Sequence, residues 1–250
     1  MKKLLIITML IYAQVTAYGI SEYNAGDTLF VVASTGLNLR DKMGLKGKIL
    51  STIPYGHRLI VKVEKPPFPW FNTDSVQIFE SYSWYKAENE TTTPYWIKGK
   101  WAKVKYGEIE GYVFDGFLSK NGPLSKKRNG RFESFEGYIR RNYEPEDSIQ
   151  VAYNSYLDYH STKLEFKSGC VIEYGTTTKT GWRRLFIFDF SLEEVLLFLK
   201  YLNGNELEDD TLHLISANDR EGKYFFYGEI SSVEVKLIGS LVAISYVFWC

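Results

Sequence analysis

The chain is poor in the residue types on which most catalytic and metal sites depend. Among 250 residues there are only two cysteines and three histidines, and they are not spaced in the pairs that bind zinc. No Gly-rich phosphate-binding loop is present. The carboxylates at residues 206–210 read as a solvated acidic turn, to which we assign no glycosidase role. The sequence therefore predicts no cofactor and no metal, and it favours a function other than catalysis.

Charge of one sign is not in excess either. The 30 Lys and Arg residues are balanced by 30 Asp and Glu residues. Because a nucleic-acid-binding domain is expected to be strongly basic, we expect no nucleic-acid partner. The local exception is the basic run at residues 126–131. It indicates either a solvated, solubilising linker or a contact for an anionic polymer.

Long hydrophobic runs are missing beyond the N-terminus. A basic pair opens the chain, residues 4–15 are almost all apolar, and small residues lead up to Ala17. The run is too short to span a bilayer, so residues 1–17 are predicted to be a signal peptide cleaved after Ala17. No later stretch has the length and apolarity of a membrane span, so we expect no integral membrane segment after cleavage. The protein is predicted to be periplasmic or secreted.

Aromatic residues, by contrast, are abundant, with 19 Tyr, 16 Phe and 6 Trp, and this composition favours strands. Residues 27–63 form short alternating segments separated by Gly, Pro and Asn, which is typical of a small barrel or sandwich. Residues 135–250 predict an antiparallel sheet with one main helix, whose start is a Ser191–Glu194 capping box. The predicted fold class is mainly β: a small β-barrel followed by an α+β domain.

Four motifs follow one another in the first half. They are Leu37-Asn38-Leu39-Arg40, a strand after Gly56, Trp101-Ala102-Lys103-Val104 and Gly111-Tyr112-Val113. This order resembles the bacterial SH3-like (SH3b) domain family. The resemblance covers residues 26–120 and implies an SH3-like small β-barrel with a binding role, often towards cell-wall peptidoglycan or a peptide.

Residues 64–100 interrupt this pattern as an insertion that holds nine aromatic residues. A structureless loop of this length is unusual, so we expect the insertion to fold back as a hairpin or lid. Exposed aromatic rings stack on sugars or on Pro-rich peptides, and clusters of them are common at binding hot spots. The predicted ligand-binding residues are Trp70, Trp84, Tyr85 and Trp96. The alternative is that the aromatic residues form a core against the barrel or the second domain.

The two cysteines, Cys170 and Cys250, could form a disulfide in an oxidising compartment, or both could be buried thiols. The sequence around Cys170 resembles the active-site motif of L,D-transpeptidases. One residue of that motif is missing here, and Ile172 occupies the position where the motif has Arg. A cysteine nucleophile would also need one of three histidines as its base. They are His57, His160 and His213.

The predicted organisation is a signal peptide at 1–17, an SH3b-like barrel at 26–120, a linker at 121–134 and an α+β domain of no recognised family at 135–250. The predicted function is that of an exported, non-catalytic binding protein. Its SH3b-like module would recognise a cell-envelope component, peptidoglycan or peptide, or a protein partner. The alternatives are a cell-wall hydrolase or peptidase with its site in the C-terminal domain, or a secreted inhibitor or immunity-type protein.

Overall fold

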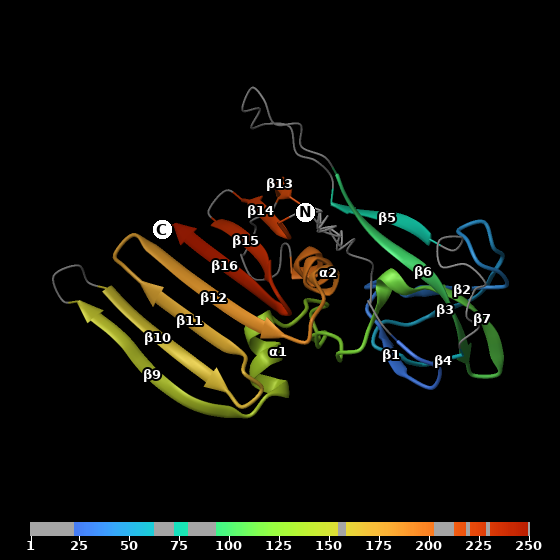
Figure 1. Ribbon diagram of the computed structural model, residues 1–250, viewed down its shortest axis with the longest axis horizontal. Helices are drawn as coiled ribbons and strands as arrows, with labels where there is room; N and C mark the ends of the chain where they lie inside the picture. Colours follow the sequence, from blue (N-terminus) through green and yellow to red (C-terminus); the bar gives the residue numbers. More distant parts are fainter. Residues whose placement is uncertain are drawn as a thin grey trace, which may run out of the picture.

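The computed structural model describes residues 23–62, 73–79, 94–154, 159–202, 213–218, 221–228 and 231–249. Over these residues the chain forms two antiparallel sheets and two α-helices (Figure 1). The prediction of a mainly β chain is confirmed. Neither of the described helices has the length and apolarity needed to cross a membrane.

The first sheet has the strand order β3-β2-β7-β6-β4-β1-β8, and β5 lies beside β6. Its strands are β1 (Thr28–Val31), β2 (Leu37–Arg40), β3 (Ile49–Ile53), β4 (Arg58–Val61), β5 (Thr73–Phe79), β6 (Tyr95–Tyr106), β7 (Ile109–Phe114) and β8 (Leu118–Ser119). In the part of the chain that is described, this sheet is an open path and not a closed barrel. One physical reason is that the first half of β6 leaves the path to pair with β5.

The predicted alternation in β2 is confirmed. Leu37 and Leu39 are buried in the core of the first sheet, whereas Asn38 and Arg40 are half-buried on the other face. This is the pattern of a strand with one covered face, because successive side chains point to opposite sides.

The second sheet has the order β13-β14-β15-β16-β12-β11-β10-β9, with every neighbouring pair antiparallel. Its strands are β9 (Pro145–Asn154), β10 (Tyr159–Phe166), β11 (Val171–Thr176), β12 (Thr180–Phe188), β13 (His213–Asn218), β14 (Lys223–Tyr227), β15 (Ser231–Ile238) and β16 (Leu241–Trp249). The last four strands form the antiparallel meander that their short turns predict.

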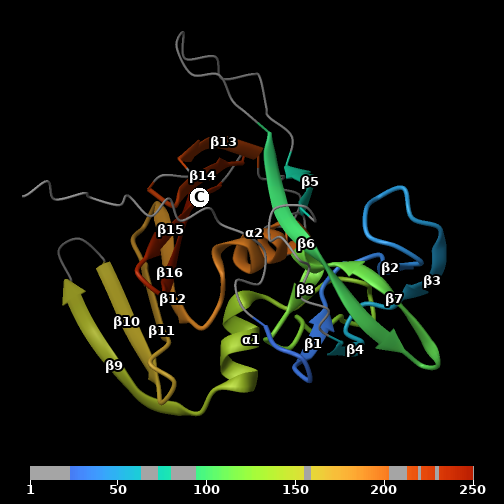
Figure 2. The ribbon, with the colours of Figure 1, turned by 45° about the vertical axis from the view of Figure 1, so that its right-hand side comes forward.

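Two helices lie between the sheets, α1 (Phe135–Asn142) and α2 (Leu192–Leu202) (Figures 1 and 2). The capping box of α2 is confirmed: Glu194 N–H donates to Ser191 Oγ at 3.1 Å, and Ser191 N–H donates to Glu194 Oε2 at 2.7 Å. We expected one main helix in this half of the chain, and α1 is a second helix that the sequence did not predict. That helix begins after Ser134, whose Oγ accepts a hydrogen bond from Gly137 N–H at 2.9 Å.

The strand β6 contributes to two cores. Tyr95, Ile97 and Trp101 belong to a core shared with the helices and the second sheet. Ala102 and Val104 belong to the core of the first sheet. The buried face of β6 therefore changes between Trp101 and Ala102, and one strand ties the two halves together. Trp101 is buried in the shared core, where its ring centroid lies 6.0 Å from that of Phe114.

Polar contacts also join the halves. Tyr201 of α2 accepts a hydrogen bond from Ser34 N–H at 3.2 Å, and Asn121 Nδ2 donates to Asp189 O at 2.8 Å. Ser119 Oγ of β8 donates to Glu194, the same carboxylate that caps α2. The predicted domain limits of 26–120, 121–134 and 135–250 stay a prediction. The packing that surrounds those limits is continuous from one half to the other.

Candidate functional site

The described part of the insertion is an antiparallel pair made by β5 and the first half of β6. Val76 lies opposite Ile97 and Gln77 lies opposite Trp96. The two strands extend beyond the rest of the first sheet and lie beside α2 and the second sheet (Figures 1 and 2). We call this pair the β5–β6 arm, comprising residues 73–79 and 95–100.

One face of the β5–β6 arm is packed against the second half. Phe79 contacts Phe226 with ring centroids 5.0 Å apart, and Tyr95 meets Tyr224 edge to face at 5.1 Å. Both partners lie on β14. Lys200 Nζ of α2 also donates to the carbonyl of Ile78 at 2.6 Å, on the outer strand of the arm. Aromatic pairs of this geometry add to the energy of burial, so this face holds the arm in place.

The other face of the β5–β6 arm is open. Trp96 is 44% exposed on this face, and its neighbours Gln77 and Lys98 are exposed as well. Tyr95 and Trp96 are adjacent in the chain, so they point to opposite sides of the strand. The structure therefore assigns one aromatic residue to the core and presents the next to solvent.

Of the four predicted binding residues, one lies among the described residues. Trp96 is exposed on a strand whose opposite face is fixed. Trp70, Trp84 and Tyr85 lie outside the described residues, so their part in a site stays a prediction. The alternative, an aromatic core against the second half, holds for Phe79 and Tyr95. Within the described residues, the insertion therefore buries aromatic rings on one face of the arm and exposes Trp96 on the other.

A buried carboxylate supports the base of the arm. Asp115 lies in the 3₁₀ turn η1 (Asp115–Phe117) and accepts hydrogen bonds from Lys100 N–H at 2.5 Å and from Tyr23 Oη at 2.9 Å. Burial raises the pKa of Asp115 to about 6, although these hydrogen bonds act in the opposite direction. A Cβ at Gly99 would lie 2.6 Å from Asp115 Oδ1, so only glycine fits there.

Trp101 of β6, directly after the last residue of the arm, also supports it. Its Nε1 donates to Asp74 Oδ2 of β5 at 2.6 Å, which ties the two strands of the arm together near their base. Neither Asp115 nor Asp74 was identified from the sequence. The signal available for Asp115 was an Asp-Gly pair directly after a strand, which on its own indicates only a turn.

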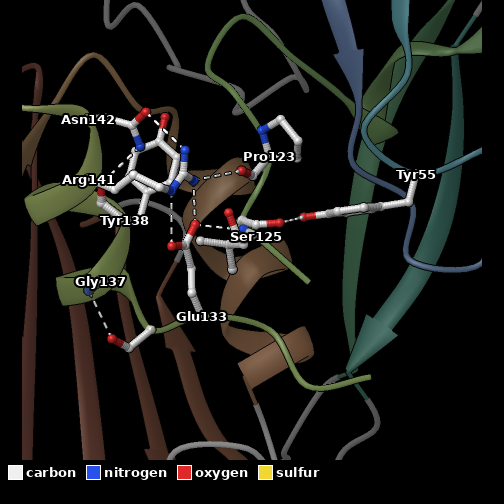
Figure 3. A network of polar contacts seen from close by, with 10 residues as sticks. Tyr55, Pro123, Ser125, Glu133, Gly137, Tyr138, Arg141 and Asn142 are labelled. Atoms are coloured by element: carbon white, nitrogen blue, oxygen red, sulfur yellow. Dashed lines mark hydrogen bonds and ion pairs between the residues drawn. The ribbon is translucent and has the colours of Figure 1, made fainter. Parts of the chain in front are cut away.

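A second polar network lies in the connector between the sheets (Figure 3). Glu133 accepts hydrogen bonds from Ser125 N–H at 2.6 Å and from Arg141 of α1. Burial alone would raise the pKa of Glu133, but the hydrogen bonds and charge of Arg141 hold it below its usual range. Tyr55 Oη of the first half donates to Leu124 O at 2.8 Å. The connector is therefore fixed to both halves.

Cys170 has the environment of a packing residue. It is 1% exposed and directly precedes β11, in the shared core. His160 pairs with Thr176 at the far end of β11, six residues along the strand from Cys170, which corresponds to about 20 Å. The side chain of His213 lies outside the described residues. The geometry therefore gives no support to a Cys170–His160 nucleophile and base.

The predicted Cys170–Cys250 disulfide stays a prediction, because Cys250 lies outside the described residues. Cys170 itself is a free, buried cysteine.

Within the described ranges, no three His, Cys, Asp or Glu side chains gather in the way that a metal ion requires. Comparison of the chain with protein-family models, with curated proteins and with solved structures gave no match.

Proposed function

We propose that this protein is an exported, non-catalytic binding protein, and that the open face of the β5–β6 arm is part of its ligand site. The ligand class we propose is a cell-envelope component, with the glycan of peptidoglycan as the first candidate. The observation that carries the proposal is the exposure of Trp96 on a strand whose other face is packed on β14.

Rigidity is the physical reason why this arrangement suits binding. A ring held on a fixed strand loses little conformational freedom when a ligand stacks on it, so less of the interaction energy is offset. Tryptophan offers the largest flat surface for a sugar face and is enriched at binding hot spots. Gln77 and Lys98 next to the ring offer donors for hydroxyl or carboxylate groups.

We further propose that the first half is an SH3-like module of the SH3b kind. The motifs behind this proposal fall on β2, β4, β6 and β7, which are consecutive in the sheet order as β2-β7-β6-β4. The insertion separates β4 from β6 and adds β5 beside β6. The insertion therefore alters any ligand groove of the SH3b kind.

The test is a pulldown with purified, insoluble peptidoglycan. We expect the wild type to sediment with it and the Trp70→Ala, Trp84→Ala, Trp96→Ala triple variant to stay in solution. Trp249→Ala is the matched control, because Trp249 is also exposed (39%) but lies on the second sheet. Failure of the wild type to sediment would overturn the proposal for peptidoglycan. Equal loss in the Trp249 variant would overturn the assignment of the site to the arm.

A further inference from the structure

The basic run between the two sheets is an ordered hairpin and not an extended linker. Lys126 and Phe132 form an antiparallel bridge, and Lys127 N–H donates to Arg131 O at 2.7 Å. Gly130 takes a positive φ of 83° at the turn and donates to Lys127 O at 2.9 Å. Asn129 Oδ1 accepts from Arg131 N–H at 3.1 Å. We call residues 125–132 the basic hairpin.

The base of the basic hairpin is held from both sides. Glu133 closes it by accepting from Ser125 N–H and from Arg141 (Figure 3). The ring of Phe132 meets Tyr55 of the first half edge to face at 5.2 Å and stacks on Tyr201 of α2 at 5.4 Å. The hairpin is thereby presented in one orientation relative to both sheets.

The charges on the basic hairpin are unbalanced. Four cations occur within six residues, and the sequence holds no Asp or Glu between residues 119 and 132. Lys127, Arg128 and Arg131 are exposed, and none of the three has an ion-pair partner within the described residues. The next acids along the chain are engaged elsewhere: Glu133 pairs with Arg141, and Glu136 pairs with Arg140 and Arg183.

We propose that the basic hairpin binds a linear polyanion that bears phosphate groups. Unpaired Lys and Arg attract such a polymer through counterion release, and guanidinium groups bind phosphate in a bidentate way. The exposed side chains at 125–131 are Ser, Lys, Arg and Asn, with none that is apolar. Stable attachment to a bilayer needs an apolar anchor beside the charges, so a flexible polymer fits this hairpin better than a membrane surface.

The test uses long-chain inorganic polyphosphate, which contains no sugar and so reports independently of the peptidoglycan assay. Binding to the full chain is measured over a range of about 50 to 200 mM salt. The variant is Lys127→Gln, Arg128→Gln, Arg131→Gln. The matched control is Lys42→Gln, Lys46→Gln, Lys48→Gln, which removes the same charge from another exposed loop. Thermal unfolding of both variants is recorded to show that they remain folded.

We expect the hairpin variant to bind polyphosphate at least about tenfold more weakly at low salt. The slope of log binding constant against log salt concentration should be less steep by roughly 2 than that of the wild type. The control is expected to bind like the wild type. Equal binding by the hairpin variant, equal loss in the control, or no binding by the wild type would each overturn the proposal. Binding to vesicles of anionic phospholipid but not to polyphosphate would overturn the choice of a polymer.

Discussion

At the scale of single residues, Asp115 is a buried carboxyl group, and burial disfavours its charged form. It is 2% exposed, and burial raises its pKa to about 6 from an ordinary value near 3.8. Because the folded protein holds this proton more tightly than the unfolded chain, the stability contributed by Asp115 is present at low pH. It is lost as the pH rises from about 4 to above 6.

Replacement of Asp115 by Asn removes this titration while keeping the shape of the side chain. We expect the variant to gain stability relative to the wild type as the pH rises from 4 to 7, by up to about 3 kcal/mol. The measurement is the free energy of unfolding in urea at both pH values. The exposed Glu110→Gln is the control and should leave the pH dependence as it is in the wild type. An Asp115→Asn variant with an unchanged pH dependence would contradict this account.

At the scale of elements, α2 shows how a local signal and a distant contact combine. Ser191 and Glu194 satisfy the first N–H groups of the helix by a reciprocal pair of hydrogen bonds. The same Glu194 accepts from Ser119 of the first sheet, and burial raises its pKa. The start of α2 is therefore fixed both by its own sequence and by the other half of the protein.

Loss of the cap should weaken the whole protein. We expect Ser191→Ala to lower the free energy of unfolding by about 1 kcal/mol, which is the usual cost of removing a serine cap. Ser240→Ala is the control, because Ser240 lies in the exposed turn between β15 and β16. Both are measured by chemical denaturation. If the two variants are equally stable, the cap does not contribute as we infer.

The elements differ in how far the sequence alone predicts them. The capping box of α2 and the final meander are local patterns, and both were predictable. The helix α1 was missed because its first turn holds Gly137, a weak helix former. The opposite roles of Tyr95 and Trp96 could not be read from the sequence. The alternation of a strand shows that the side chains of two neighbouring residues point to opposite faces. Which of the two faces is buried depends on the packing of Tyr224 against Tyr95.

At the scale of the whole molecule, the shared core makes the two halves depend on each other. Phe79 of the arm is buried against Phe226 of the second sheet, and the core extends from β5 and β6 through both helices. Because this core contains residues of both halves, we expect the protein to unfold in one cooperative step. The arm that carries Trp96 should therefore be as stable as the molecule.

The aromatic contact between the halves can be tested by truncation. We expect Phe79→Ala to lower the free energy of unfolding by about 3 kcal/mol, because a buried ring is removed and a cavity remains. Fluorescence and circular dichroism should still report a single, coincident transition. The exposed Tyr227→Ala is the control and should change stability far less. Two separate transitions in the wild type would show that the halves fold independently.

The central claim is that Trp96 on the packed arm contacts the ligand, and the most direct measurement is the affinity of Trp96→Ala for purified peptidoglycan beside that of Trp249→Ala. The account predicts that Trp96→Ala binds at least about tenfold more weakly, which is the range for a stacked hot-spot residue, with unchanged stability. It predicts wild-type affinity for Trp249→Ala. Equal affinities for the two variants would contradict it.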